Sequence, residues 1–91
     1  MRPVHITDLT HTARALMCVE PEERVSLATR IMQEADWADR YTKRFHKRHA
    51  VWGNGTLAAA SAQYKQSVEP TFDDRAYGQC LITALTMLQD R

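Results

Sequence analysis

The sequence predicts an all-α fold: a small four-helix domain with one long central helix and a short third helix, bundle-like or orthogonal. Three observations support this prediction. Apolar residues recur every three or four positions through most of the chain, which is the spacing of buried helical faces. Prolines, glycines and one Asn-Gly pair divide the chain into helical stretches. With 91 residues, 44% of them apolar and 25% charged, the chain is expected to form one domain over residues 1–91.

The first helix is expected to begin where Thr7 or Asp8 can cap it and to end near Cys18. The segment Val19-Glu20-Pro21 separates this helix from the next one, because the residue before a proline is disfavoured in helical geometry. A connection this short favours an antiparallel arrangement with the next helix.

The central helix is expected to span Glu20 to His49. Acidic residues gather at its beginning and basic residues at its end, which suits the helix dipole. Its buried face is marked by an apolar stripe: Val25, Ala28, Ile31, Met32, Ala35 and Ala38. Without interruption this helix would be about 42 Å long, so it is expected to overhang its shorter neighbours or to kink.

Gly53 and the pair Asn54-Gly55 predict a tight turn, since glycine and asparagine tolerate positive φ. The residues on either side do not alternate as strands do, so a β-hairpin is not expected. Thr56 is the expected cap of a short third helix, from Leu57 to about Tyr64.

The last helix is expected to be capped by Asp73, with Phe72 packed against Tyr77 across its first turn. An apolar stripe then runs to the C-terminus: Tyr77, Cys80, Leu81, Ala84, Leu85 and Leu88. The residues expected in the core of the domain are Leu9, Ala13, Leu16, Ile31, Met32, Ala35, Leu81, Leu85 and Leu88.

Charge and cysteine content restrict the possible environments of the chain. A formal net charge of +1 gives no overall attraction to nucleic acid or acidic membranes. No apolar segment resembles a signal peptide or a membrane span, so we expect a cytoplasmic protein without a membrane partner. Cys18 and Cys80 lie on apolar helical stripes and are expected to be buried free thiols.

The end of the central helix carries a basic run: Arg40, Lys43, Arg44, Lys47 and Arg48. Such a stripe could follow a phosphate backbone, which makes nucleic acid a possible partner. The alternative is a solvated helix end, in which Asp36 pairs with Arg40 and Asp39 pairs with Lys43.

Trp37 lies nearly opposite the buried stripe of the central helix, on the side that also carries Tyr41 and Phe45. It is therefore either covered by another part of the chain or exposed as an anchor for a partner, and tryptophan is enriched among such anchors. Three short helices cannot easily cover both sides of the long one. We therefore expect an open apolar patch at Trp37, Tyr41 and Phe45, which a second copy or another protein would cover.

No group of residues indicates an enzyme, and no cofactor or metal is expected. His46 and His49 have a spacing compatible with a shared metal, but no third ligand lies nearby in the sequence. Trp52, beside two glycines, is expected either to fill the end of the core or to line a small pocket, and that pocket would suit a ligand-binding domain or a small enzyme.

Three segments show a resemblance: MRPVHITDL at the start, ADRY at 38–41 and HAVWGNGTLAAA at 49–60. They resemble a family of short uncharacterised alphaproteobacterial proteins, which implies a bacterial cytoplasmic origin and transfers no catalytic residue. The leading hypothesis is a non-enzymatic helical protein-interaction module, a small bacterial regulatory or adaptor protein that binds another protein or itself. The alternative is a nucleic-acid accessory protein that uses the basic run from Arg40 to Arg48.

Overall fold

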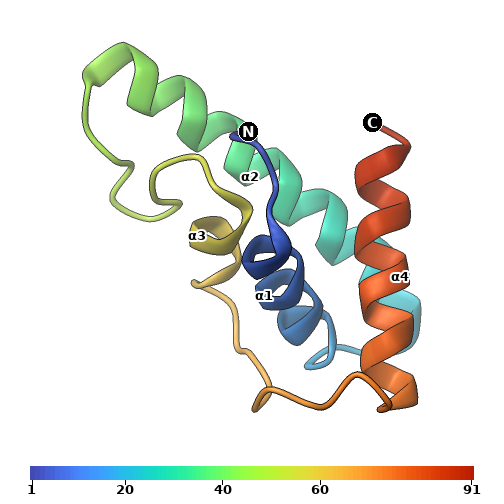
Figure 1. Ribbon diagram of the computed structural model, residues 1–91. Coiled ribbons are helices and arrows are strands. Elements are labelled where there is room, and N and C mark those ends of the chain that lie inside the picture. Colours follow the sequence, from blue (N-terminus) through green and yellow to red (C-terminus); the bar gives the residue numbers. More distant parts are fainter.

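The fold is all-α, as predicted. The computed structural model describes residues 1–91. It contains α1 (Ile6–Leu16), the 3-10 turn η1 (Pro21–Glu23), α2 (Arg24–Phe45), α3 (Leu57–Ser61) and α4 (Arg75–Gln89). Figure 1 shows α2 running diagonally along the length of the molecule, with α1 against its middle, α4 on one side and α3 on the other. No strand is present, and no helix combines the length and apolar character that crossing a membrane requires.

Helix α1 begins earlier than the sequence indicated. Its N-cap is His5, and Asp8 lies three residues into the helix, where its carboxylate accepts a hydrogen bond of 2.9 Å from the backbone N–H of His5. The prediction of Thr7 or Asp8 as the cap was therefore wrong. The carboxylate of Asp8 still satisfies a free N–H at the helix start, the task for which a capping residue is needed.

Helix α2 is long and central, as predicted, but shorter than the expected span. Pro21 opens the separate turn η1, and the α-helix proper covers 22 residues, about 33 Å. It ends at His46, whose φ of 56° is left-handed and whose N–H donates to the carbonyl of Thr42 at 2.8 Å. A left-handed residue is the usual end of an α-helix, although glycine fills that position most often.

The core lies where α1, α2 and α4 meet, with α3 closing one end. Five of the nine predicted core residues are buried, namely Ala13, Leu16, Ile31, Met32 and Ala35. Leu9, Leu81 and Leu88 pack partly buried against this core. The prediction for Leu85 was wrong, because its side chain is 45% exposed. Only one side of α4 is covered, and Leu85 lies beyond the edge of the buried stripe formed by Tyr77, Cys80 and Ala84.

The two cysteines differ in environment. Cys80 is buried and free, as predicted, and burial raises the pKa of its thiol. Cys18 is free but exposed, so the prediction that it is buried was wrong. Helix α1 ends at Leu16, so Cys18 lies in the connection to α2 and not on a helical stripe.

The tight turn predicted at 53–55 is confirmed, with φ of 82° at Gly53 and 100° at Gly55. A Cβ at Gly55 would lie 2.7 Å from the Cα of Asp39, so the loop packs directly on α2 there. Thr56 caps α3 by accepting from the N–H of Ala59, but α3 ends at Ser61, before the predicted Tyr64.

The start of α4 differs from the prediction by one residue. Asp74, not Asp73, is the N-cap, and its carboxylate accepts from the backbone N–H of Tyr77 at 3.0 Å. The predicted contact between Phe72 and Tyr77 is present, with the two rings stacked and their centroids 5.8 Å apart.

Candidate protein-interaction surface

Five rings form a continuous aromatic cluster beside the C-terminal half of α2: Trp37, Tyr41, Phe45, His49 and Trp52. The ring of Trp52 stacks on His49 with centroids 4.6 Å apart and also packs against Trp37 at 5.3 Å. Tyr41 lies between Phe45 at 4.7 Å and His49 at 4.9 Å. Each ring therefore packs on at least one other ring of the cluster.

Two parts of the sequence build this cluster. Three of its members lie four residues apart on α2, so they share one side of the helix. The chain then reverses at His46 and brings His49 and Trp52 back along that side. His49 holds the returning loop, because its Nδ1 accepts hydrogen bonds from the backbone N–H groups of Val51 at 3.1 Å and Trp52 at 3.0 Å. Backbone hydrogen bonds between His49 and Gly53 close the same turn.

The cluster remains open to solvent. Phe45 is 51% exposed and Trp37 is 42% exposed, while the other three rings are half-buried. Trp52 covers one side of the Trp37 ring and solvent reaches another, so the chain covers this ring only in part. The expectation that Trp52 fills the end of the core was wrong, because it packs on Trp37 and His49 outside the core.

Five cations lie in the same segment of the chain as the aromatic cluster, and we call them the basic rim: Arg40, Lys43, Arg44, Lys47 and Arg48. All five are exposed. Only Lys43 has an ion-pair partner, the predicted Asp39 at 3.1 Å. The predicted pair of Asp36 with Arg40 is absent, because Asp36 binds the N-terminal ammonium and Arg91 instead. Four cations of the basic rim therefore have no ion-pair partner within the chain.

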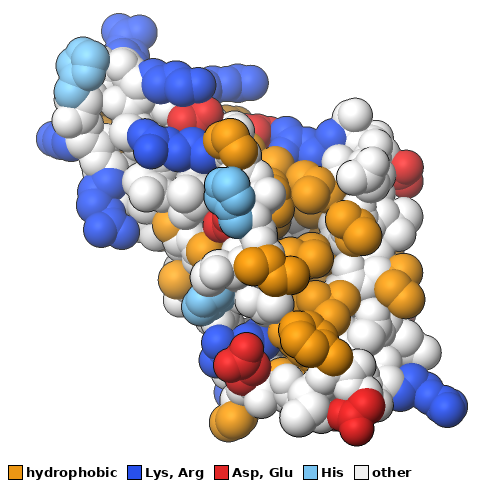
Figure 2. Space-filling model, viewed as in Figure 1, with side chains coloured by type: hydrophobic (Ala, Val, Ile, Leu, Met, Phe, Trp, Pro, Cys, Tyr) orange, Lys and Arg blue, Asp and Glu red, His pale blue; other side chains and the backbone are white.

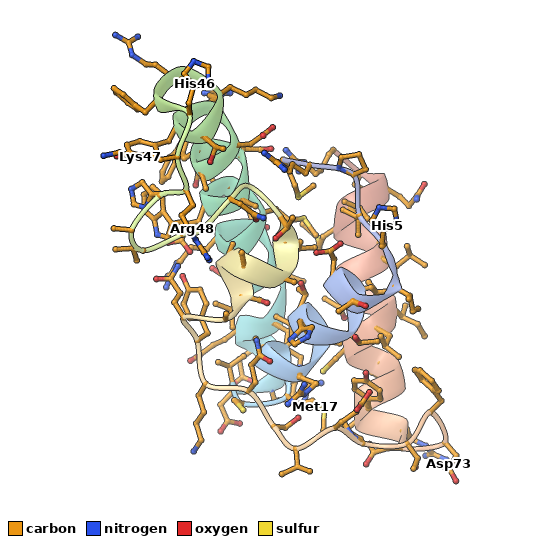
Figure 3. The ribbon with its side chains drawn as sticks, turned by 60° about the vertical axis from the view of Figure 1, so that its left-hand side comes forward. His5, Met17, His46, Lys47, Arg48 and Asp73 are labelled. Atoms are coloured by element: carbon orange, nitrogen blue, oxygen red, sulfur yellow. The ribbon has the colours of Figure 1, made fainter.

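Positive charge is concentrated at this end of the molecule. Residues 40–49 contain five Lys or Arg residues and no acid, whereas the remaining 81 residues contain seven basic and eleven acidic ones. The near-neutral total thus combines a segment of +5 with a remainder of −4. Figure 2 shows Lys and Arg side chains gathered at one end of the molecule. In Figure 3, His46 and Lys47 lie at the end opposite to Met17 and Asp73, and Arg48 lies farther along the loop toward the middle of the molecule.

One cation of the basic rim also contacts the cluster itself. The guanidinium carbon of Arg44 lies 5.5 Å from the centroid of the Phe45 ring, within the range of a cation–π interaction. This contact holds the Arg44 side chain over the aromatic cluster. An approaching partner therefore meets an apolar surface and unpaired positive charge together.

A pocket of about 320 Å³ lies next to the cluster, where the loop after α2 faces the end of α3. Its lining includes Arg48, His49, Gly53 and Ala59, but not Trp52. No group of three His, Cys, Asp or Glu residues is arranged to hold a metal ion. His46 is exposed, and His49 already uses one ring nitrogen to hold its own loop.

Acidic residues at the middle of α2 serve a structural purpose. Asp39 is only 5% exposed, and its Oδ2 lies 3.3 Å from the N-terminal nitrogen of Met1. Burial by itself would raise the pKa of Asp39, but hydrogen bonds from Lys43 and the N-terminal ammonium hold the pKa below its usual value. Burial likewise opposes ionisation of Asp36, and the N-terminal ammonium and Arg91 lower its pKa. These carboxylates are occupied by partners within the chain.

Comparison with known proteins is informative about family alone. A family model described as "Domain of unknown function (DUF7742)" matches residues 2–88. No curated protein matches the chain, and no solved structure does. The match spans nearly the whole domain, and the chain belongs to this family, as the resemblance to an uncharacterised family predicted.

Proposed function

We propose that this member of the DUF7742 family is a small bacterial regulatory or adaptor protein, without enzymatic activity, that acts in the cytoplasm as a helical protein-interaction module. Its binding surface is the aromatic cluster together with the basic rim. The observation that supports this function is a partly exposed aromatic cluster in the same segment as four exposed cations that lack ion-pair partners. Tryptophan, tyrosine and arginine are the residue types most enriched at the energetic centres of protein interfaces.

The charge of the surface indicates the kind of partner. Two copies joined through this surface would bring two segments of +5 together, which disfavours self-association there. An acidic segment with apolar side chains would instead pair with Arg40, Arg44 and the loop cations while covering Trp37 and Phe45. Such complementarity raises the association rate and excludes wrong partners.

A nucleic-acid accessory function is the second candidate, favoured by the same unpaired cations along the end of α2. Single-stranded nucleic acid binds where positive charge accompanies aromatic faces on which bases can stack. In this cluster the ring faces of His49 and Trp52 are already stacked on each other. Fewer faces are therefore available to bases, and a protein partner fits the geometry better.

Intrinsic fluorescence provides a direct test, because both tryptophans of the chain belong to the aromatic cluster. The protein would be titrated with three probes: an acidic peptide of alternating Glu and Leu, a peptide with Gln in place of Glu, and an oligothymidine. We expect the acidic peptide to change the tryptophan emission in a saturable way, and added salt to weaken its binding. The neutral peptide should bind at least about tenfold more weakly.

Matched variants identify the surface. Arg44→Gln and Phe45→Ala should each weaken binding of the acidic peptide while leaving the circular dichroism spectrum unchanged, since both side chains are exposed. Lys65→Gln removes an exposed cation that belongs neither to the aromatic cluster nor to the basic rim, and it should have no effect. Tight binding of the oligothymidine with no response to the acidic peptide would favour the nucleic-acid function. No response to either probe would reject both candidates for this surface.

A further inference from the structure

Helix α4 has a second apolar face, separate from the one it buries in the core. Ile82 is 66% exposed and Leu85 is 45% exposed. Next to them, a pocket of about 310 Å³ lies where the start of α1 meets α4, lined by Val4, His5, Ile6, Leu9, Leu85, Leu88 and Gln89. Figure 2 shows apolar side chains gathered over this junction of α1 and α4.

Gly78 provides independent evidence that something packs there. It lies inside α4, where glycine weakens a helix, and it has an ordinary negative φ. A Cβ built on it would meet no atom within 4 Å, so no contact within the chain requires a glycine. A residue without a side chain on an open helix face lets a second backbone approach closely.

The register of the exposed face fits a second copy of the same helix. Gly78, Ile82, Leu85 and Gln89 follow one another at steps of four, three and four residues, the pattern of a coiled-coil seam. These steps are the same in both directions along the helix. In an antiparallel pair, Ile82 of one copy therefore lies opposite Leu85 of the other, and Gly78 lies opposite Gln89. The two-fold axis repeats each of these contacts.

The charges of α4 favour the same arrangement. From Ala76 to Gln89 the helix has no charged residue, whereas Arg75 precedes this stretch and Asp90 follows it. In the antiparallel pair, Arg75 of each copy lies beside Asp90 of the other, and the two helix dipoles oppose each other. The only charges of α4 are thus the complementary pair at its two ends, Arg75 and Asp90, and no like charges of α4 would face each other and repel the second copy.

We propose that the protein forms a two-fold dimer through antiparallel contact of α4 with α4 of a second copy. Ile82 of each copy enters the pocket between α1 and α4 of the other. The contact is independent of the aromatic cluster and the basic rim, which lie at the end of α2 away from α4 (Figure 1). A dimer formed in this way carries two such surfaces and would bind a partner with repeated acidic segments more tightly than a monomer would.

Sedimentation equilibrium from low micromolar to millimolar protein tests the dimer. We expect the wild-type mass to double across this range. Ile82→Glu should raise the dissociation constant at least about tenfold, because it places a charge in an apolar contact. Gly78→Leu should do the same while the monomer stays folded, since the added side chain extends into open space. Val68→Glu, at a loop position that is 90% exposed, is the control and should leave association unchanged.

Two charged variants test the antiparallel register of the proposed α4–α4 contact. Ile82→Glu and Leu85→Lys should each be monomeric alone, because each homodimer would bury two unpaired charges. Mixed together they should form a heterodimer, since the introduced glutamate of one chain faces the introduced lysine of the other. A parallel pair would not show this rescue, because positions 82 and 85 would then each face themselves.

Three results would overturn the proposal. The first is a wild-type chain that stays monomeric at millimolar concentration. The second is a dimer that Ile82→Glu and Gly78→Leu leave intact. The third is a mixture of the two charged variants that remains monomeric although each variant is folded by circular dichroism.

Discussion

The carboxylate of Asp8 accepts a hydrogen bond of 2.9 Å from the backbone N–H of Ala58, and it thereby joins the start of α1 to the start of α3. Its other oxygen accepts from the N–H of His5. One carboxylate that is only 6% exposed thus lies between the positive ends of two helices. Because α3 has five residues and is too short to be stable alone, its position depends on contacts of this kind.

Asp8→Ala should therefore destabilise the domain more than a typical surface change. The substitution removes hydrogen bonds from two backbone N–H groups to a buried carboxylate, and we expect it to lower the free energy of unfolding by about 2–3 kcal/mol. Urea denaturation followed by circular dichroism measures this. Asp73→Ala, at an exposed position just before α4, is the control and should change stability by less than about 0.5 kcal/mol. Equal effects of the two substitutions would show that Asp8 does not join the helices.

Stability should depend on pH through Asp36 and Asp39. The pKa of each is below its ordinary value of 3.8, because hydrogen bonds from the N-terminal ammonium and a nearby Lys or Arg outweigh the effect of burial. A lowered pKa in the folded state means that the ionised carboxylates stabilise the fold above about pH 4. This contribution is lost as the pH falls through the folded-state pKa. We expect the melting temperature to decrease on acidification below pH 4.

Asp36→Asn provides the matched comparison for this pH dependence. The variant should be less stable than wild type at neutral pH, and its melting temperature should change less between pH 4 and pH 2. Protein with an unmodified N-terminal ammonium is needed, because Met1 supplies one of the partners. If the pH profiles of variant and wild type are parallel, Asp36 does not cause the loss of stability in acid.

The two thiols should react at different rates. Cys18 is exposed and should react with a thiol reagent at once, whereas Cys80 is buried with a raised pKa and should react only when the chain unfolds. A colourimetric assay in native buffer should therefore show one fast equivalent, and a second equivalent after denaturant is added. Cys18→Ser should remove the fast phase alone. Two fast equivalents in the native protein would show that Cys80 is accessible.

The helical periodicity was sufficient to predict the fold class and the centre of α2. Ile31, Met32 and Ala35 are buried because their spacing places them on one face of a helix that three others pack against. Leu85 was predicted wrongly, because a stripe of apolar residues does not reveal how much of it the neighbouring helices cover. Cys18 was predicted wrongly because the helix ended two residues earlier than its apolar pattern.

The candidate surface was predicted only in part. Trp37, Tyr41 and Phe45 share one side of α2, and their spacing of four residues indicated this. His49 and Trp52 join them through a chain reversal at a left-handed His46, and no periodic pattern extends across such a loop. The partners of Asp36 are also far away in sequence, since it binds the N-terminal ammonium of Met1 and the side chain of Arg91. Proximity of this kind follows from the tertiary arrangement.

Helix α2 is packed unequally along its length, and its less buried end is expected to unwind first. Every buried residue of α2 lies between Leu27 and Asp39, and the last six residues of the helix contribute none. The helix is thus anchored in the core at one end and held at the other mainly by the loop that folds back onto it. Its final turns are therefore expected to unwind in local fluctuations that leave the core intact. The end that carries the aromatic cluster could then adjust its shape to a partner, while the same helix holds the rest of the domain fixed.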